Sequence, residues 1–594
     1  MELAKTESTR LFKLIISLPS GNGQKDVARS PRVYNSQHCE FPVAVMRFLL
    51  LLLTAVLISL AWLSPDHTYP WLTFASEMLS FAAFLSLLAL FLNRPLQLPR
   101  VQLLALPIVC IPMIQWGFGL VVDFSSALLS SAYLLGFWFA VLLGYNLSRS
   151  PDDHERMFTL SSYLMFAVAL VTSLIACIQW LNLESYVPGV MNLYSHRPYA
   201  NFAQPNNMST FLIMGLLACL YLAEKQPLKQ RYIWPVAALI IFAITLSQSR
   251  TAWVFGLFFI IYWTYKSWRY PTRLKRYVVL LWAIGFFAVG LLFPRFTGLI
   301  QKLKDGDVVQ TSSVVQRASA GHERLGIWHQ MLDAINQKPW TGYGWNQTSI
   351  AELSSMSSNT IHVWFTSAHN LILDLLVWNG WLLGGVIVLC ILIWIFWLNA
   401  HARTTESIIA CLMVAAVLIH ALLEYPLQYA YFLLPVGFLM GLIQAQTPDL
   451  TPRSVPVAVT RSVWVLGIVL LALIWRDYSL YKVNSLRILK KQPANSEIWG
   501  SSKILILTEF DQRLYWLKLS PVAQLTSTEL DQIEKMVQNK ATPYNLQKYA
   551  QLLLANHQFE KAQQQIAYLN RLHKKNYTLQ DLQQANASAV QQSK

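Results

Sequence analysis

Three ionisable side chains stand beside long apolar runs, where titratable groups are uncommon. His369 directly precedes LILDLLVWNGWLLG, Arg250 lies in LSQSRTAWVFGLFF, and Arg324 lies in SAGHERLGIWHQML. A histidine at the end of an apolar run is partly desolvated and still reaches water, which suits a neutral imidazole acting as a base near pH 7. Each residue also has an ordinary interpretation, namely a structural histidine, an arginine that snorkels at the end of a span, and a solvated surface arginine.

Two further polar clusters stand at the ends of apolar runs, in RPYANFAQPNNMS and in LEYPLQYAYF, and the second contains a carboxylate, Glu424. Helix caps would account for the amides of the first cluster, and an interfacial aromatic belt for the tyrosines of the second. The additional candidate binding residues, one of them in SPDHTYPW, are His67, Asn201, Gln204, Tyr425 and Tyr429.

Membrane-spanning helices must position these groups. The chain has 594 residues, of which 55% are hydrophobic and only 13% are charged. Apolar runs of about 17–25 residues recur along most of its length, and each is long enough to cross the hydrocarbon core of a bilayer. We therefore predict an all-α polytopic membrane protein with about 12–13 transmembrane helices. The net charge of +16 is not evidence for nucleic acid as a partner, because most basic residues flank the predicted spans.

The distribution of Lys and Arg predicts which connections share a side of the membrane. Connections rich in both residues alternate with connections nearly free of them, such as 64–71 and 424–430. By the positive-inside rule the basic connections are cytoplasmic, so all the candidate residues named above lie outside. The basic connections are 93–100, 147–157, 224–232, 266–276, 401–406 and the link that contains Arg453 and Arg461.

The spans divide the chain into five predicted parts. A polar N-terminal tail, which could be an over-extended start with Met46 as the true beginning, precedes the first set of spans. A large outer loop separates that set from a second set, and a polar C-terminal part follows outside. The five parts are residues 1–45 (tail), 46–293 (spans 1–9), 294–369 (outer loop), 370–477 (spans 10–13) and 478–594 (C-terminal domain).

Helical spacing of apolar residues is also evident outside the spans. In the outer loop Leu325, Trp328, Leu332 and Ile335 predict an amphipathic helix that begins near Arg324. In the C-terminal part, NLQKYAQLLLANHQFEKAQQQIAYLNRLHKK predicts two amphipathic helices around a short turn, similar to one tetratricopeptide-like unit.

The sequence indicates neither a disulfide framework nor a metal site. Five of the six cysteines lie inside apolar runs, and none has the spacing of metal ligands. The outer loops contain no DxD-like pair and no cluster of His, Asp and Glu. We therefore expect no metal and no other cofactor.

Several segments together resemble a known family. They are SPDHTYPWLTFASE, HRPYANFAQPNN, SQSRTAW, HERLGIWHQML with PWTGYGW, SAHNLILDLLVWNGWLLG and HALLEYPLQYAYF. In this order and on one side of the membrane, they resemble the bacterial O-linked oligosaccharyltransferases that glycosylate pilins and other periplasmic proteins. Those enzymes belong to the O-antigen ligase and polymerase superfamily, whose hallmark is a long outer loop just before a histidine-bearing span. The likeness covers about residues 46–446.

The resemblance implies a reaction. A glycan assembled on undecaprenyl diphosphate would be transferred en bloc to a Ser or Thr hydroxyl of a periplasmic protein such as a pilin. By resemblance, His369 is the essential histidine, and Arg250 and Arg324 match the arginines that hold the diphosphate. The reaction is then inverting and independent of metal. The enzyme would lie in the bacterial inner membrane with its active site on the periplasmic face.

Two other functions are compatible with part of these features. An O-antigen ligase or a glycan polymerase would use a saccharide acceptor, whereas the appended C-terminal domain and the HTYPW stretch favour a protein acceptor. A transporter would place polar groups near the bilayer midplane on broken helices. This chain instead keeps its spans apolar and collects polar groups on one face.

Overall fold

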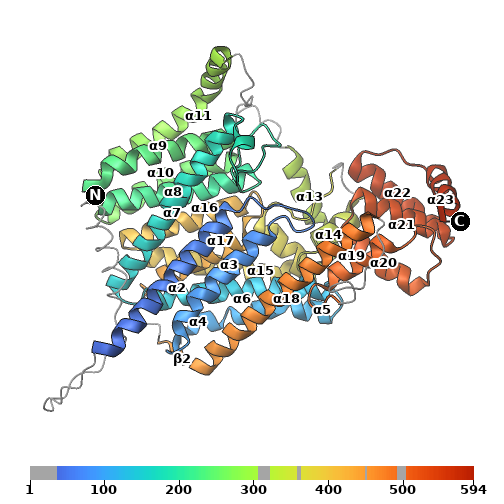
Figure 1. Cartoon of the computed structure of the whole chain (residues 1–594), viewed down its shortest axis with the longest axis horizontal. Coiled ribbons are helices and arrows are strands. Elements are labelled where there is room, and N and C mark those ends of the chain that lie inside the picture. The colour runs from blue at the N-terminus through green and yellow to red at the C-terminus, as the bar shows by residue number, and fades with distance from the viewer. Residues whose placement is uncertain (1–36, 305–321, 357–362, 448–450, 491–502, 594) are drawn as a thin grey trace.

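The structure is a computed structural model that describes residues 37–304, 322–356, 363–447, 451–490 and 503–593 (Figure 1). Most of the predicted N-terminal tail lies outside these ranges. Over the described residues, nine helices are long and apolar enough to cross a membrane, and three shorter helices are apolar as well. The predicted all-α polytopic fold is confirmed.

The first half of the chain forms a series of long helices with short connections. In order they are α2 (Gln37–Leu63), α3 (Phe74–Leu88), α5 (Leu106–Gly117), α6 (Phe124–Leu147), α7 (Pro151–Trp180), α8 (Pro205–Lys225), α9 (Gln230–Ser247), α10 (Arg250–Arg269) and α11 (Arg276–Lys304). The short elements between them are η1 (Ala89–Phe91), β1 (Leu96–Leu98), α4 (Arg100–Leu103), η2 (Glu184–Tyr186) and η3 (Pro227–Lys229).

The second half begins with the outer loop and ends with a helical domain, drawn orange to red at the right of Figure 1. Its first part comprises α13 (His322–Gln337), α14 (Thr348–Ser354), α15 (Leu371–His401), α16 (Thr405–Ala421), η5 (Pro426–Gln428), α17 (Ala430–Gln444), β2 (Arg453–Val455) and α18 (Val457–Leu489). The C-terminal helices are α19 (Thr508–Lys518), α20 (Ser527–Asn539), α21 (Pro543–Ala555), α22 (Phe559–His573) and α23 (Leu579–Ser593). The two predicted amphipathic helices are α21 and α22.

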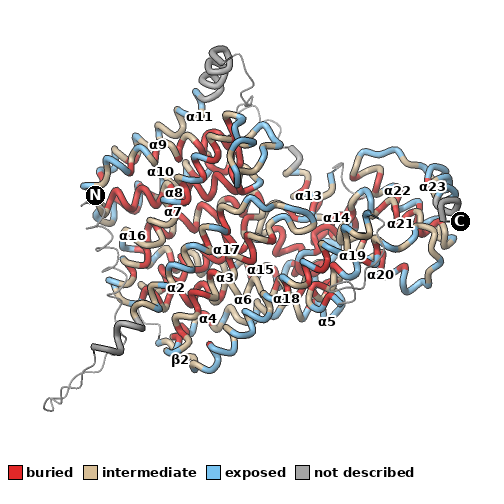
Figure 2. Tube along the Cα trace, viewed as in Figure 1, coloured by how far each residue is buried: buried red, intermediate tan, exposed pale blue. Residues whose placement is uncertain are grey.

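Burial separates the central helices from the peripheral ones (Figure 2). In α8, 89% of the most apolar window is buried inside the protein, against 11% in α2 and in α18. The exposed residues of α2 are themselves apolar, for example Leu49, Leu52 and Val56. Contiguous exposed apolar surface of this kind is what a lipid bilayer covers, so α2 and α18 lie at the lipid-facing periphery.

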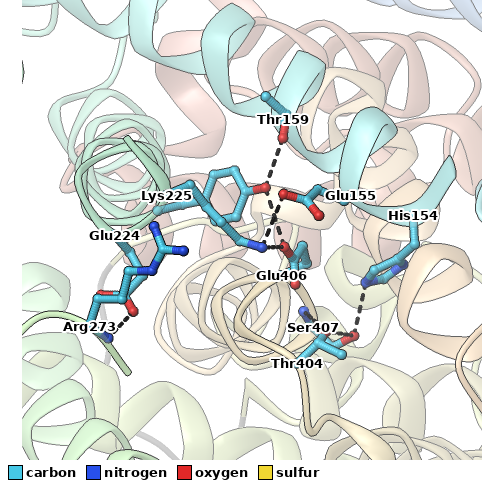
Figure 3. A network of polar contacts seen from close by, with 10 residues as sticks. His154, Glu155, Thr159, Glu224, Lys225, Arg273, Thr404, Glu406 and Ser407 are labelled. Carbon is cyan, nitrogen blue, oxygen red and sulfur yellow. Dashed lines mark hydrogen bonds and ion pairs between the residues drawn. The ribbon is translucent and has the colours of Figure 1, made fainter. Parts of the chain in front are cut away.

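One end of the helix bundle joins the connections predicted to be cytoplasmic. There β1 and β2 pair antiparallel, with Leu96 opposite Val455. Figure 3 shows a polar network at the same ends of α7, α8 and α16, in which Lys225 Nζ lies 2.5 Å from Glu406 Oε1 and 3.1 Å from Glu155 Oε1. These contacts tie the basic connections to one another, as expected if they share one side of the membrane.

Helix α15 is interrupted near its start. Gly380 has φ 75° and ψ 178°, so the intrahelical hydrogen bonds stop there. The PWTGYGW loop fills the break, because the backbone N–H of Tyr343 donates to the Val377 carbonyl at 2.9 Å and that of Gly344 to the Trp378 carbonyl at 3.0 Å. The segment after the break is still long enough to cross a bilayer. The segment before it therefore lies, together with His369, at the end of the bundle away from the 401–406 connection.

The C-terminal domain shares a hydrophobic core with the outer loop. Leu353 and Met356, at the end of α14, are buried in the same cluster as the apolar faces of α20 to α23. Ser349 Oγ donates to the Gln538 carbonyl at 2.8 Å, and Trp364 also packs against this cluster. The domain is thus fixed directly to the segment that leads into His369.

Candidate functional site

His369 is held in a left-handed backbone conformation just before α15. Its φ is 53°, which is uncommon for a residue other than glycine. Ser367 Oγ donates to Asp374 Oδ2 at 2.6 Å, the Ala368 N–H donates to Asp374 Oδ1 at 2.8 Å, and the His369 N–H donates to Ser367 Oγ at 3.1 Å. Such a conformation costs on the order of 1–3 kcal/mol and persists only when its surroundings fix it, as Asp374 does here.

The partner of Nδ1 determines which ring nitrogen of His369 can act as a base. Nδ1 lies 3.0 Å from the Ser367 carbonyl oxygen. A carbonyl only accepts hydrogen bonds, so Nδ1 carries the proton of the neutral ring and Nε2 has a free lone pair. The side chain is 25% exposed. Nε2 is therefore the atom that can take a proton from a substrate.

Glu424, just beyond the end of α16, connects three of the polar groups. Its Oε1 accepts from Arg324 Nη2 and, at 3.3 Å, from Asn206 Nδ2. Its Oε2 lies 3.7 Å from His369 Nε2, and its side chain is only 9% exposed. One buried carboxylate thus joins the outer-loop arginine, the start of α8 and the candidate base.

Arg324 is partly buried and experiences the charges of both Glu424 and Arg250. Burial lowers the pKa of Arg324, Glu424 opposes this effect, and the positive charge of Arg250 lowers that pKa further. Trp328, one turn after Arg324 on α13, donates from Nε1 to the Ala368 carbonyl at 3.1 Å, which fixes α13 against the segment carrying His369. The Glu424 carboxylate thus pairs with Arg324 and faces the imidazole, and the positive charge of Arg250 also acts on Arg324.

The predicted apolar face of the outer-loop helix was partly wrong. Leu325 is 61% exposed and Leu332 is 38% exposed. The face that α13 buries instead consists of Ile327, Met331, Ala334 and Ile335. Spacing alone does not distinguish these two overlapping stripes, because both recur with the helical period and only the packing against α14 and α15 selects one.

A tight turn presents Arg250. Helix α9 ends at Ser247, Gln248 adopts a left-handed conformation with φ 48°, and Arg250 begins α10. Arg197 fixes this turn, because its Nε donates to the Ser247 carbonyl at 2.7 Å and its Nη2 donates to Asn206 Oδ1 at 3.3 Å. Arg197 therefore links the turn that presents Arg250 to the Asn206–Glu424 pair.

The two candidate tyrosines line the side of the site next to Glu424. The Tyr425 ring meets the His369 ring edge-on, with centroids 5.3 Å apart, and Tyr429 follows at 6.1 Å from Tyr425. Burial, then the nearby Glu424 charge, raises the pKa of Tyr425, and burial raises that of Tyr429. Both phenols therefore stay protonated and can donate hydrogen bonds.

His67 and Asn201 hold the loop that precedes α8. His67 Nε2 donates to the Asn201 carbonyl at 2.9 Å. Asn201 Nδ2 donates to the Leu63 and Gly189 carbonyls, both at 2.8 Å. These bonds connect the loop to the end of α2, so their observed contacts are with the scaffold. Gln204, the residue before α8, is half-buried and does not cap the helix with its side chain.

Three residues at the site had no role assigned from the sequence. Glu424 and Arg197 stand in segments that were singled out as polar, but nothing in the sequence pairs them with Arg324 or with the turn before Arg250. Asp374 gave a weaker signal, as a lone carboxylate in the first turn of an apolar helix. Among the described residues no three His, Cys, Asp or Glu side chains gather so that they could hold a metal ion.

This arrangement has a definite chemical capacity. The guanidinium groups can bind a phosphate or diphosphate through charge-assisted hydrogen bonds. The imidazole can remove the proton of a hydroxyl that approaches Nε2. The buried carboxylate can stabilise the imidazolium that results. These groups lie at the starts of α10, α13 and α15 and just beyond the end of α16.

Three family models match the chain. A model described as O-antigen ligase matches residues 235–389, which include Arg250, Arg324 and His369. A model described as protein glycosylation ligase matches residues 198–223, from the loop before α8 to near the end of that helix. A model described as virulence factor membrane-bound polymerase, C-terminal, matches residues 408–587.

Two curated proteins of Acinetobacter baylyi are similar to the chain. One, a general O-oligosaccharyltransferase, is 90% identical over 568 residues, which cover 96% of this chain and 100% of that protein. The other, a ComP-specific O-oligosaccharyltransferase, is 30% identical over 389 residues, which cover 65% of this chain and 69% of that protein.

Proposed function

Because the chain belongs to the bacterial O-linked oligosaccharyltransferases of the O-antigen ligase superfamily, we propose that it transfers a preassembled oligosaccharide en bloc from undecaprenyl diphosphate to a Ser or Thr hydroxyl of a periplasmic protein such as a pilin. Membership establishes the coarser activity, the transfer of an oligosaccharide onto protein. The observation that carries the mechanism is the shared carboxylate of Glu424, which joins Arg324 to the candidate base His369.

The donor diphosphate binds to Arg324 and Arg250. In the absence of donor, the Glu424 carboxylate occupies part of the hydrogen-bonding capacity of Arg324. A diphosphate carries more negative charge than a carboxylate and forms bidentate bonds with a guanidinium group. Arg324 therefore exchanges one anion for a stronger one when the donor enters. The polyprenyl chain stays in the lipid while its diphosphate lies at the outer ends of the helices.

The acceptor hydroxyl reacts on the side of His369. As its oxygen forms a bond with the anomeric carbon, its proton passes to Nε2. The bond between the anomeric carbon and the diphosphate oxygen breaks, and its electron pair stays on the diphosphate, which the two guanidinium groups stabilise. Attack from the face opposite the leaving group inverts the anomeric configuration. The imidazolium then faces Glu424 and loses its proton to water through its exposed edge.

The positive charge that this reaction requires comes from the chain itself. The leaving diphosphate is already anionic and needs no proton, only compensation of its charge. Arg324 and Arg250 supply two fixed positive charges in a partly buried setting, where they act more strongly than in bulk water. The proposal therefore includes no metal and no cofactor.

The comparisons support a protein acceptor and, within that class, more than one protein. The relative that covers nearly the whole chain is named a general O-oligosaccharyltransferase, whereas the relative named for a single acceptor, ComP, is far less similar. The alternative is an O-antigen ligase or glycan polymerase that uses a saccharide acceptor, and the models matched at 235–389 and 408–587 are compatible with it. The match to the protein glycosylation ligase model favours protein.

We place the enzyme in the bacterial inner membrane with the site on the periplasmic face. The basic connections meet at the opposite ends of α8 and α16 from Glu424 and Asn206. Helix α8 has 21 residues, which correspond to about 30 Å of rise and hence to the thickness of a bilayer core. Cytoplasmic basic connections thus require a periplasmic site.

The test is the intact mass of a pilin-like acceptor co-expressed with a lipid-linked glycan pathway and this enzyme. We expect a mass gain of one glycan, and its loss with His369→Ala. His329→Ala is the matched control, because His329 lies in the same outer loop with a side chain that is 74% exposed. A gain that survives His369→Ala would refute His369 as the base. No gain with any protein, together with restored long-chain glycan in a deficient host, would favour the ligase or polymerase.

A further inference from the structure

The turn that precedes Arg250 contains buried polar atoms that its own fold leaves unsatisfied. Gln248 is 5% exposed and Ser249 is 2% exposed. Neither Nε2 nor Oε1 of Gln248, nor Oγ of Ser249, has a hydrogen-bond partner among the described residues. An unsatisfied buried polar group destabilises the folded state, so three adjacent ones require an explanation.

Several hydrogen bonds hold the backbone of the turn, and none of them uses the unsatisfied atoms. Gln248 has φ 48°, and the Ser249 N–H donates to Ser247 Oγ at 3.3 Å. Ser247 Oγ in turn donates to the Ile244 carbonyl at 2.5 Å, and Arg197 fixes the Ser247 carbonyl from outside. The unsatisfied groups thus stand, buried, on a backbone that hydrogen bonds hold in place.

The surroundings of the turn favour an anion. Ser249 is the N-cap of α10, a helix of 20 residues, yet its side chain does not cap the helix. The N-terminus of a long helix carries partial positive charge and attracts phosphate. Arg250 follows directly, and Arg197 contacts the turn. A serine hydroxyl, an amide N–H and two guanidinium groups together match the oxygens of a phosphate.

The carbonyl side of Gln248 adds a second requirement. A phosphate at neutral pH accepts hydrogen bonds and offers no donor, so it cannot satisfy Gln248 Oε1. A ligand that satisfies both atoms of the amide needs an acceptor and a donor side by side. A glycosyl phosphate has both, since the first sugar presents hydroxyl or N–H groups next to the phosphate oxygens.

We propose, on the basis of the proposed function, that Gln248 and Ser249 bind the glycosyl-phosphate junction of the lipid-linked donor. Ser249 Oγ and Gln248 Nε2 donate to phosphate oxygens, and Gln248 Oε1 accepts from the first sugar. The turn thereby aligns the anomeric carbon relative to the arginines. It also distinguishes a glycosylated lipid diphosphate from the bare lipid diphosphate that leaves after transfer.

The experiment uses the full-length enzyme in detergent, with the lipid-linked oligosaccharide and bare undecaprenyl diphosphate as separate probes. We expect Gln248→Met to weaken binding of the glycosylated probe about tenfold or more and to change binding of the bare diphosphate less. Ser249→Ala should weaken both. The KM for the acceptor protein should not change.

Thermal unfolding without ligand separates a binding role from a structural one. Each replacement removes an unsatisfied buried polar group, so we expect the unfolding temperature to stay unchanged or to rise. Gln444→Met is the matched control, since Gln444 is fully buried, both of its amide atoms are unsatisfied, and it ends α17 away from the site. The control should show the same thermal behaviour and unaltered binding of both probes.

Three outcomes would overturn the proposal. They are unchanged binding of the glycosylated probe by both turn variants, an equal loss with Gln444→Met, or a lowered unfolding temperature that accounts for the lost binding. Because binding is read directly, the proposal is tested even if no protein acceptor is glycosylated. Failure of transfer with retained, Gln248-dependent binding would refute the proposed function and leave the donor site standing.

Discussion

Replacement of Glu424 by glutamine should separate the two halves of the proposed mechanism. The carboxylate holds Arg324 through Oε1 and faces His369 Nε2 across 3.7 Å through Oε2. Glutamine keeps the size and one acceptor oxygen but removes the charge. We therefore expect a lower kcat, because the imidazolium loses its counter-charge, and a lower KM for the donor, because the diphosphate no longer competes for Arg324.

The magnitude follows from the geometry. Two unit charges at this separation interact with about 4 kcal/mol at an effective dielectric constant near 20. The side chain of His369 is 25% exposed, and the solvent there reduces the effect to about 2–3 kcal/mol. This corresponds to a decrease in kcat of about 30- to 150-fold. The donor KM should fall by several-fold.

The assay is steady-state transfer by purified enzyme, with lipid-linked donor and acceptor protein varied separately and the product quantified by intact mass. Glu406→Gln, in the first turn of α16, is the matched control. Glu406 is 5% exposed and pairs with Lys225 at 2.5 Å, but it lies at the other end of α16. This control should lower thermal stability without changing kcat or KM. An unchanged kcat, or a raised donor KM, in Glu424→Gln would refute the reasoning.

Three further predictions concern two supports of the site and one buried carboxylate, Asp123, beside the C-terminal domain. Gly380→Ala should lower both the unfolding temperature and kcat. The backbone φ of Gly380 is 75°, and an added Cβ would lie 2.5 Å from a backbone carbonyl of the PWTGYGW loop. The control Gly385→Ala, with open space around its added Cβ, should change neither quantity. Asp374→Asn should lower kcat by roughly tenfold or more, because one amide oxygen cannot accept all the hydrogen bonds that fix the backbone at His369. A kcat equal to that of the wild type would contradict this role of Asp374. Burial, then the charge of Glu509, raises the pKa of Asp123 to about 6, so between about pH 4 and pH 6 the folded protein retains a proton that the unfolded chain releases. The stability contribution of Asp123 should therefore decrease as the pH rises through this window. The unfolding temperature of Asp123→Asn minus that of the wild type should accordingly grow with pH. A difference that shrinks with pH would contradict the raised pKa of Asp123.

The sequence alone determined the fold class. Apolar runs of bilayer length, with Lys and Arg on alternate connections, predict a polytopic helical protein because the bilayer accepts only segments that satisfy their own backbone. The order of the polar segments also predicted the family, which the comparisons confirm. Local periodicity sufficed for α21 and α22. It did not select the buried face of α13, since two overlapping stripes have the same period.

Tertiary structure decided how the candidate residues are joined. The sequence separates Arg324 from Glu424 by 100 positions and His369 from Glu424 by 55, and no pattern pairs groups at such distances. The choice of Nε2 as the basic nitrogen depends on a carbonyl two residues before His369 and on a left-handed backbone fixed by Asp374. Likewise, only packing shows that His67 and Asn201 support a loop and that the amide of Gln248 is buried without a partner. Residue types therefore indicate which chemistry is available, whereas the balance of hydrogen bonds and charges in the folded chain determines which atoms can perform it.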